Sequence, residues 1–479
     1  MAFSDLYTPD PRFSALGSDF ADAVDPARFP DAKLRYWNDR WADSVGLGAL
    51  SAQEKQRHFH GFAMLPDNQH QPLAMRYHGH QFRTYNPDLG DGRGFLFAQL
   101  RDHEGRLLDL ATKGSGQTPW SRAGDGRLTL KGAVREILAT EMLEALGVYT
   151  SKTFAVYETG EPLERNDEPS PTRSAVLTRL GHSHLRFGSF QRHAYENAPD
   201  RIEALIAHAL ENYYPDLKNR PDPASTLMQA VAEASAHLVA GWMAAGFVHG
   251  VLNTDNLNVT GESFDYGPWR FLPFYQPGFT AAYFDQTGLY AYARQPEAVY
   301  WALQQLAQAL SLVGDDKQLI ADLNTFPAHY RLALMDAFLA RFGLKSAGRQ
   351  EDEDMIRAFL AFMQASETPW EAVFFDHFVD IERAAQSPRA PLYKSESYRS
   401  WFERLKRHEP DRPERLQHPY FKAEAPVHMT IETVEGIWSQ IADRDDWSGL
   451  DDMLIGIGGA REAFDLGRSR SGFLNQRAD

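Results

Sequence analysis

The sequence predicts an α+β protein with two lobes, the first rich in strands and the second almost wholly helical. The chain has 479 residues, which exceeds the usual size of a single domain. Strand-type runs separated by turns occupy much of residues 95–180, whereas helical periodicity dominates from residue 199 onward. Strands followed by helices are typical of an α+β arrangement.

The composition narrows the classes of function. Hydrophobic residues make up 43% of the chain and charged residues 24%, which are ordinary globular values. The formal net charge of -16 would repel a phosphate backbone, so nucleic acid is not an expected partner. The absence of cysteine excludes disulfides, thiolate metal sites and cysteine nucleophiles. With no long apolar window and no leader-like start, we expect a cytoplasmic protein without a membrane partner.

The predicted elements follow the chain in two blocks. The first block begins with a helix at 31–45 and a hairpin with strands at 95–100 and 107–112. A helix at 129–146 is ended by Gly147, and two strands at 149–157 and 174–180 flank a polar, proline-bearing loop. Apolar residues at helical spacing predict the helices of the second block at 199–214, 223–245, 297–313, 328–342, 352–364, 369–386 and 430–442.

Two features of the first block suit a ligand that carries phosphate. The stretch LGDGRG at 89–94 holds three glycines whose amides can approach an anion, although a tight hairpin turn explains an isolated glycine cluster more simply. Lys113 ends a predicted strand and Glu136 lies on the helix that follows. In a protein-kinase N-lobe a lysine and a glutamate in this order form an ion pair beside the nucleotide phosphates. Taken singly, Glu136 would be read as a surface residue.

The strongest signal is the loop HGVLNTDN at 249–256, followed by FDYG at 264–267. Kinase-like enzymes place an aspartate two residues after the histidine, where this chain has Val251. The metal-binding asparagine is kept as Asn256, and Asp265 occupies the place of the second metal ligand, an oxygen-only pair that suits magnesium or manganese. Asp255 is the candidate replacement base, with a turn-stabilising role as the alternative.

Together with YHGHQF at 77–82 and VLTRLGHSHLRFGSF at 176–190, these motifs resemble the selenoprotein O (SelO/YdiU) family of pseudokinase-fold protein adenylyltransferases. The resemblance implies a protein-kinase-like fold in which ATP is bound in a flipped orientation and AMP is transferred. It also implies that Asp255 accepts the proton and that Asn256 and Asp265 hold Mg²⁺ or Mn²⁺. The implied ATP contacts are Gly90, Gly92, Arg93, Lys113, Asp125, Gly126, Arg179, Arg186 and Asp265.

The resemblance therefore leads us to expect AMP transfer from ATP to Ser, Thr or Tyr hydroxyls of proteins, with release of pyrophosphate. Transfer of UMP from UTP and self-modification are variants of the same chemistry. The alternatives are a non-catalytic ATP-binding pseudokinase scaffold and a conventional kinase that transfers a phosphoryl group. Many members of the family carry a selenocysteine or cysteine near the end of the chain, and this sequence has neither.

The motifs divide the chain into three predicted parts. Residues 1–195 form an N-terminal extension and a nucleotide-binding N-lobe. Residues 196–407 form a helical C-lobe that carries the catalytic and metal-binding loops. Residues 408–479 form a proline-rich, charged linker and a helical C-terminal extension.

Overall fold

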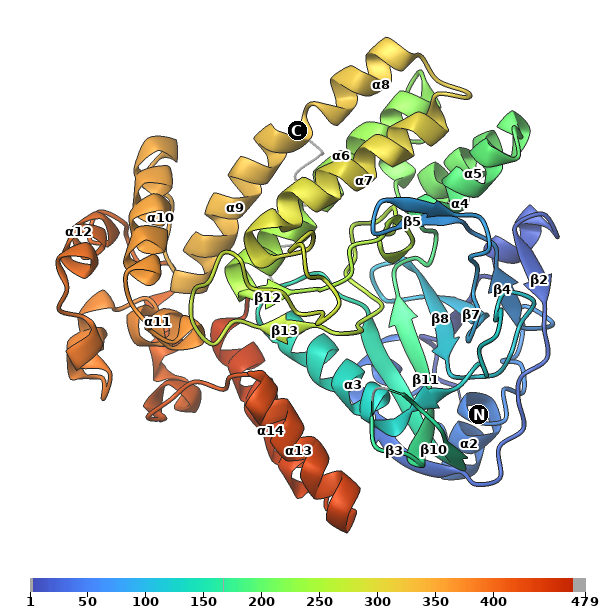
Figure 1. Ribbon diagram of the computed structural model, residues 1–479, viewed down its shortest axis with the longest axis horizontal. Coiled ribbons are helices and arrows are strands. Elements are labelled where there is room, and N and C mark those ends of the chain that lie inside the picture. The colour runs from blue at the N-terminus through green and yellow to red at the C-terminus, as the bar shows by residue number, and fades with distance from the viewer. Residues whose placement is uncertain (1–2, 167, 468–479) are drawn as a thin grey trace.

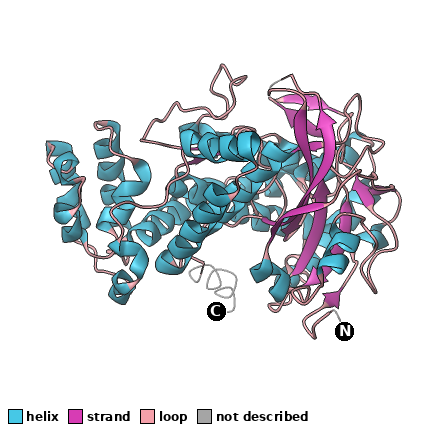
Figure 2. Cartoon of the chain, turned by 90° about the horizontal axis from the view of Figure 1, so that it is seen from below, coloured by secondary structure: helices cyan, strands magenta, loops and turns pink. Residues whose placement is uncertain are grey.

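The computed structural model describes residues 3–166 and 168–467, and within them the chain is a mixed α and β protein built on a large antiparallel sheet. The sheet lies at one end of the molecule and most of the helices lie at the other (Figure 2). None of the described helices is long and apolar enough to cross a membrane. Residues 468–479, the last part of the predicted C-terminal extension, lie outside the described residues.

The sheet has the strand order β2-β4-β7-β8-β11-β10-β3, with β1 paired to β7 and β9 paired to β11. Its centre is the predicted hairpin of β7 and β8 beside the long hairpin of β10 and β11. Two further pairs, β5 with β6 and β12 with β13, stand apart from it. The bounds are β1 (Thr8–Pro9), β2 (Ala21–Ala23), β3 (Lys33–Trp37), β4 (Leu73–Met75), β5 (Gly79–Gln81), β6 (Thr84–Asn86), β7 (Leu96–Arg101), β8 (Leu107–Lys113), β9 (Leu128–Thr129), β10 (Lys152–Leu163), β11 (Thr172–Gly181), β12 (Phe247–Val248) and β13 (Arg270–Phe271).

Both faces of the sheet are covered, which is why β8 is buried along its whole length. On one face Leu108 and Leu110 pack with residues of α1 and α2. On the other face Leu177 of β11 packs with Ala133 and Ile137 of α3. Neighbouring side chains of a strand point to opposite faces, so this packing decides which residues of β8 and β11 face α3.

The helical part packs around the mostly buried α6, whose bounds match the predicted helix at 223–245. Asp222 caps its first turn, a proline follows at the first helical position, and Gly246 ends it in a left-handed conformation. The helices are α1 (Asp39–Ser44), α2 (Ala52–Phe59), α3 (Leu130–Ala145), α4 (Phe187–Tyr195), α5 (Pro199–Asn212), α6 (Pro223–Ala245), α7 (Gln295–Leu310), α8 (Asp316–Leu323), α9 (Phe326–Phe342), α10 (Arg349–Gln364), α11 (Trp370–His377), α12 (Glu396–Leu405), α13 (Ile431–Arg444) and α14 (Ser448–Phe464).

Three predicted boundaries are wrong. The helix at 31–45 is the strand β3 followed by the short helix α1, because β3 pairs with β10 at the sheet edge. The loop predicted after residue 157 is shorter, because β10 and β11 continue as a bulged hairpin to Leu163 and from Thr172. The helix at 369–386 breaks after His377, where Val379 has a positive φ of 60°, and resumes as a 3₁₀ turn. Helices α2, α4, α8, α12 and α14 were not predicted.

The C-terminal helices lie against the sheet end of the molecule rather than apart from it. In Figure 1, α13 and α14 run beside α3. Lys131 of α3 pairs with Glu435 of α13 at 2.8 Å, and Arg461 of α14 pairs with Glu141 of α3. The described part of the predicted extension, residues 408–467, is therefore attached to the helix that carries Glu136.

Candidate active site

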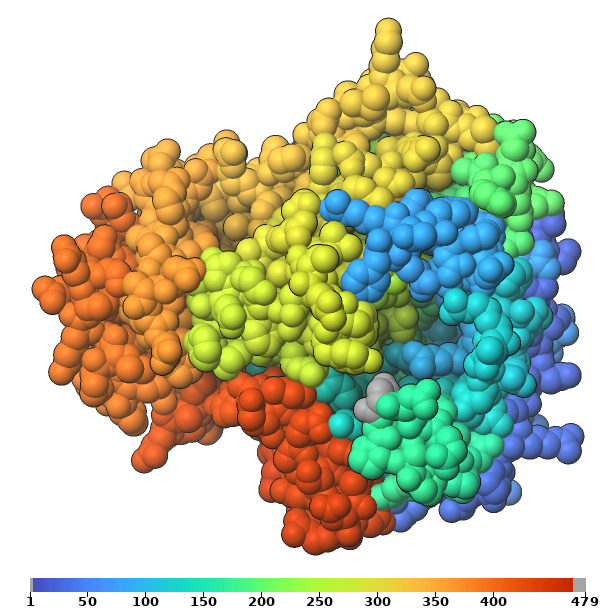
Figure 3. All heavy atoms as spheres, in the orientation of Figure 1, coloured from blue at the N-terminus to red at the C-terminus, as the bar shows by residue number. Residues whose placement is uncertain are grey.

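A cleft of about 660 Å³ opens where the glycine-rich segments, the central strands and the loop after α6 meet. Figure 3 shows it as a recess bordered by the blue segment around β5 and β6 and by the cyan segment after β8. Glu136 and Asn256 are not among the residues that line it. The predicted site residues that line it are Gly90, Gly92, Arg93, Lys113, Asp125, Gly126, Arg179, Arg186, Asp255 and Asp265.

Strand alternation places two of the cations on one face of the sheet. Lys113, the last residue of β8, and Arg179 of β11 lie on the face that packs against α3. There Glu136 lies between them, fully buried, with one oxygen 2.7 Å from Lys113 Nζ and the other 3.2 Å from Arg179. A buried carboxylate is stable when cations compensate it, and here it orients both of them toward the cleft.

Asp265 is the common partner of the cations in the cleft. Its Oδ1 lies 3.0 Å from Lys113 Nζ and 3.3 Å from Arg179, and its Oδ2 lies 4.0 Å from Arg186. Burial alone would raise the pKa of Asp265, but these three cations hold it well below its usual value. Asp265 is therefore ionised, and it adopts a left-handed backbone conformation with a φ of 61°.

The loop after β12 presents Asp255 on a 3₁₀ turn, Thr254–Asn256. The backbone carbonyl of Asp255 accepts a hydrogen bond of 2.7 Å from Arg186, which fixes the turn. Its carboxylate is buried, and within the described residues Oδ1 has no hydrogen-bond partner. Burial raises the pKa of Asp255 to about 6, against the lowering effect of Arg186. This carboxyl group can therefore exchange a proton near neutral pH.

The segment that contains β5 and β6 forms hydrogen bonds with the loop that carries Asp255. The backbone N–H of His80 donates to the Thr254 hydroxyl at 2.7 Å, and the N–H of Phe82 donates to the Asn253 side chain at 3.1 Å. A Cβ atom at Gly79 would stand 2.9 Å from Asp255 Oδ1, so the absence of a side chain there leaves room for the carboxylate. The motif YHGHQF thus contributes to the position of Asp255.

The residues that could hold a divalent metal are Asp265 and Asn256. Asn256 Nδ2 donates to the Val251 carbonyl at 3.0 Å, which leaves the carboxamide oxygen for another partner. Within the described residues no group of three His, Asp or Glu side chains could hold a metal by itself. One carboxylate and one amide oxygen fit Mg²⁺ or Mn²⁺ that takes its other ligands from phosphate and water.

The glycine-rich segments form part of the wall of the cleft. Gly126 has a φ of 69°, and beside it Asp125 pairs with Arg165 at 2.8 Å. Gly90 and Gly92 lie so close to Trp120 that an added Cβ would stand 2.3 Å from the indole at Gly90 and 2.8 Å from the Trp120 carbonyl at Gly92. These glycines are needed for close packing, whatever ligand the cleft takes.

Replacement of Gly90 by alanine is expected to displace Trp120 and to weaken nucleotide binding about tenfold or more. The reason is the 2.3 Å contact, which no rotation of the new methyl group relieves. Titration with a fluorescent ATP analogue measures the effect. Gly278→Ala is the matched control, because its Cβ would meet nothing within 4 Å. Equal affinities of the two variants would show that the wall formed by Gly90 takes no part in nucleotide binding.

Sequence reasoning missed several residues of the cleft. Asp91 pairs with Arg186 at 3.2 Å, and the Arg186 guanidinium stacks 4.4 Å from the ring centre of Tyr77. Asp91 and Tyr77 lie in motifs that carry the family resemblance, but their roles depend on contacts with Arg186, which is far away in the sequence. The lining includes seven basic and five acidic side chains, a local excess of positive charge in an acidic chain. Such a cleft favours an anionic ligand.

Comparison with known proteins gives a consistent picture. The family model for "Protein adenylyltransferase SelO" matches residues 5–457. The chain is 40% identical over 471 residues to the protein nucleotidyltransferase YdiU of Gloeobacter violaceus, covering 93% of this chain and 94% of the relative. It is 44% identical over 367 residues to the protein of the same name from Trichormus variabilis, covering 77% of this chain and 75% of the relative. A similar relative in Synechococcus elongatus is 39% identical over 467 residues, covering 93% and 94%.

Proposed function

Because the chain belongs to the SelO protein adenylyltransferase family, we propose that it transfers AMP from ATP to Ser, Thr or Tyr hydroxyls of proteins and releases pyrophosphate. The observation that carries this proposal is the position of Asp255. Its buried carboxylate faces a cationic cleft, and one of its oxygens has no hydrogen-bond partner among the described residues. Asp255 directly precedes Asn256, in a loop where Val251 stands at the position of the usual kinase aspartate. UTP as an alternative donor and self-modification are part of the proposal.

The proposed reaction uses the charges of the cleft in one displacement step. Lys113, Arg179 and Arg186 bind the phosphate oxygens and offset the charge that develops on them. The acceptor hydroxyl oxygen forms a bond with the α-phosphorus while its proton passes to Asp255. The bond between the α-phosphorus and the oxygen that bridges to the β-phosphate breaks, and pyrophosphate leaves with the electron pair.

A divalent metal would be held by Asp265 and Asn256. When bound, Mg²⁺ or Mn²⁺ would supply positive charge to the phosphate oxygens. The chain itself prepares this position, because Lys113 and Arg179 keep Asp265 ionised. The side chains of Lys113 and Arg179, which lie on the face of the sheet that packs against α3, would then bind the phosphate oxygens. Glu136 holds both side chains in place.

We also propose that the sheet and helices form the two lobes of a protein-kinase-like fold. The order of a strand lysine, a helix glutamate, a catalytic loop and an Asp-Tyr-Gly segment supports this, with residues 1–195 and 196–407 as the lobes and 408–479 as an extension. We propose that the chain has no nucleic acid partner, since its net charge of -16 would repel a phosphate backbone. A cytoplasmic location without a membrane partner is part of the same proposal.

Transfer is expected to depend on pH through Asp255. The base must be deprotonated to accept a proton, and its pKa is about 6. The rate should therefore be nearly constant above about pH 7 and fall about tenfold per unit well below pH 6. Initial rates at saturating ATP measure this profile, and unchanged circular dichroism over the same range serves as the control for folding. A rate that stays flat down to about pH 5 would exclude Asp255 as the base.

The position of a radioactive label in ATP distinguishes this function from its alternatives. The protein is incubated with Mg²⁺ or Mn²⁺, candidate acceptor proteins and ATP labelled at either the α- or the γ-phosphate. We expect label on protein from α-labelled ATP and none from γ-labelled ATP. Transfer of the γ-label alone would mean a conventional kinase. ATP binding without transfer of either label, even to the chain itself, would mean a non-catalytic scaffold.

A further inference from the structure

Three residues, one of them directly before Asp255, form a closed ring of hydrogen bonds. The backbone N–H of His80 donates to the Thr254 hydroxyl at 2.7 Å, and this hydroxyl donates to Gln191 Oε1 at 2.6 Å. Gln191 Nε2 closes the ring, because it donates to His80 Nδ1 at 2.8 Å. Thr254 is fully buried and Gln191 is 5% exposed, so water has little access to these bonds.

Gln191 lies on α4, and this helix packs closely against the segment that contains His80. The backbone carbonyl of Gly188 accepts a hydrogen bond of 3.0 Å from the N–H of His78. An added Cβ at Gly188 would stand 2.1 Å from the His78 carbonyl oxygen, so glycine permits this contact. The backbone carbonyl of Gln191 also accepts a hydrogen bond of 3.2 Å from the Tyr85 hydroxyl. The packing of α4 therefore sets the position of Gln191 independently of the ring.

The ring sets how closely Gly79 lies against the Asp255 carboxylate. His80 directly follows Gly79, and Thr254 directly precedes Asp255. The hydrogen bond between His80 and Thr254 therefore joins the two segments beside the carboxylate. An added Cβ at Gly79 would stand 2.9 Å from Asp255 Oδ1, and this oxygen is buried. The contact thus contributes to the burial that raises the pKa of Asp255 to about 6.

The proton positions in the ring follow from its donors. The nitrogen of a carboxamide can only donate, so Nδ1 of His80 accepts and the imidazole is neutral. Burial lowers the pKa of His80, although the bond with Gln191 raises it, and this keeps the imidazole neutral near neutral pH. The Thr254 hydroxyl accepts from His80 and keeps its own proton for Gln191.

We propose that Gln191 is a positioning residue for the transfer reaction. It holds Thr254 and His80 together and so keeps Gly79 against the Asp255 carboxylate. Gln191 is not among the residues that line the cleft, so it acts through Thr254 and not on the nucleotide. The inference rests on the proposed function, because the position of Asp255 affects the rate only if Asp255 is the base.

Replacement of Gln191 by methionine tests the proposal, because methionine keeps the length of the side chain and removes both of its hydrogen bonds in the ring. We expect the rate above pH 7 at saturating ATP to fall about ten- to a hundredfold, the cost of a base displaced by about 1 Å. The KM for ATP should change less than about threefold, since the phosphate-binding cations are untouched. An unchanged rate at saturating ATP would overturn the proposal.

The pH profile of the same variant separates positioning from a loss of stability. Without the ring, water can reach the carboxylate, so the pKa of Asp255 should fall from about 6 toward the ordinary value of about 4. At pH 5 the unaltered chain should keep about a tenth of its rate above pH 7, whereas Gln191→Met should keep more than about half of its own. A midpoint that stays at about pH 6 would show that Gln191 does not position the carboxylate.

Two variants of Thr254 test the ring even if Gln191→Met does not fold. Thr254→Val keeps the shape of the side chain and removes the hydroxyl, so it should reproduce the lower rate and the shifted profile. Thr254→Ser keeps the hydroxyl and should retain most of the rate. Equal rates for the valine and serine variants would overturn the proposal.

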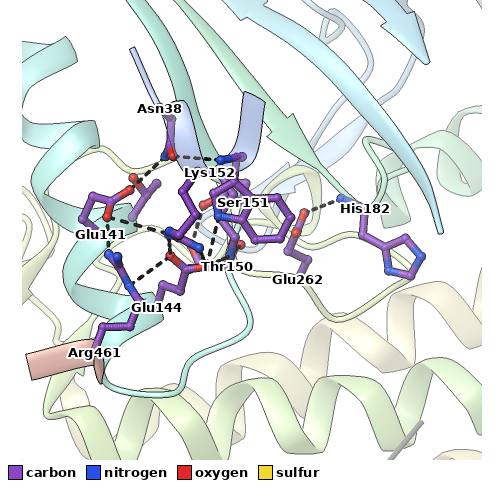
Figure 4. Close-up of polar contacts among 12 residues, drawn as sticks. Asn38, Glu141, Glu144, Thr150, Ser151, Lys152, His182, Glu262 and Arg461 are labelled. Carbon is purple, nitrogen blue, oxygen red and sulfur yellow. Dashed lines mark hydrogen bonds and ion pairs between the residues drawn. The ribbon is translucent and has the colours of Figure 1, made fainter. Parts of the chain in front are cut away.

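Asn38 provides the control for the loss of a buried carboxamide elsewhere. Figure 4 shows it beside Glu141, to which its Nδ2 donates at 3.0 Å, and it is 5% exposed, as Gln191 is. Asn38 is not among the residues that line the cleft. Asn38→Leu should lower the midpoint of urea unfolding but leave the pH profile centred at about 6. A profile that shifts equally in Asn38→Leu would contradict a specific role of Gln191.

Asp255→Asn, measured in parallel, distinguishes a failure of this inference from a failure of the proposed base. Lost transfer in Asp255→Asn, together with an unaltered rate and profile in Gln191→Met, would overturn only the positioning role. Unchanged transfer in Asp255→Asn would overturn both.

Discussion

Replacement of Asp255 by asparagine is expected to reduce AMP transfer about 10²- to 10⁴-fold, the usual contribution of a positioned general base. Asparagine keeps the size and the buried position of the side chain but cannot accept the proton. ATP affinity should change little, because the phosphate-binding cations are untouched, and Arg186 still binds the backbone carbonyl of residue 255. Initial rates with α-labelled ATP and a binding titration measure the two quantities separately.

The matched control for this variant is Asp88→Asn. Asp88 is exposed and does not line the cleft, so its loss of charge should leave both the rate and the affinity unchanged. A loss of transfer in Asp255→Asn that is accompanied by an equal loss of ATP affinity would assign Asp255 to the structure of the site rather than to proton transfer. An unchanged transfer rate in Asp255→Asn would show that Asp255 is not the base.

Replacement of Lys113 by methionine is expected to lower both stability and activity. It leaves Glu136, which is fully buried, and Asp265 with fewer compensating cations. Breaking a buried ion pair costs about 3–5 kcal/mol, and we expect the lower end because Arg179 still lies 3.2 Å from Glu136. Urea unfolding measures the stability, and transfer from α-labelled ATP measures the activity.

The double variant Lys113→Met/Glu136→Gln separates the two effects. Removal of the uncompensated charge should restore most of the free energy of unfolding, whereas transfer should stay low because the phosphate contact is still missing. Recovery of transfer together with stability would show that Lys113 acts only as a structural partner of Glu136. No recovery of stability would show that the charge of Glu136 is not the cause of the loss.

The bounds of helices and strands were predicted most accurately where local sequence signals agree with the packing. The bounds of α6 follow from its aspartate cap, its first proline and Gly246, all of which are local. The strand β3 was predicted as helix because its conformation depends on pairing with β10, more than a hundred residues away. The break after His377 depends on the left-handed backbone at Val379, which side-chain periodicity does not reveal.

The candidate site was also predicted only in part: residues with a known order along the chain were found, and residues that act through distant contacts were not. Lys113 and Glu136 were found from their order along the chain, and the structure places them 2.7 Å apart. The roles of Asp91 and Gly79 could not be predicted, because each depends on a contact with a residue far away in sequence. The excess of basic residues in the cleft could not be predicted from the composition either, since the chain as a whole is strongly acidic.

The most direct test of the account is the mass of an acceptor protein after reaction. The full chain is incubated with ATP, Mg²⁺ or Mn²⁺ and the acceptor, and intact-mass spectrometry is compared between the unaltered chain and Asp255→Asn. We expect the acceptor to gain the mass of an adenylyl group with the unaltered chain and to stay unmodified with the variant. A gain of one phosphoryl group, or an adenylyl group added equally well by Asp255→Asn, would contradict the account.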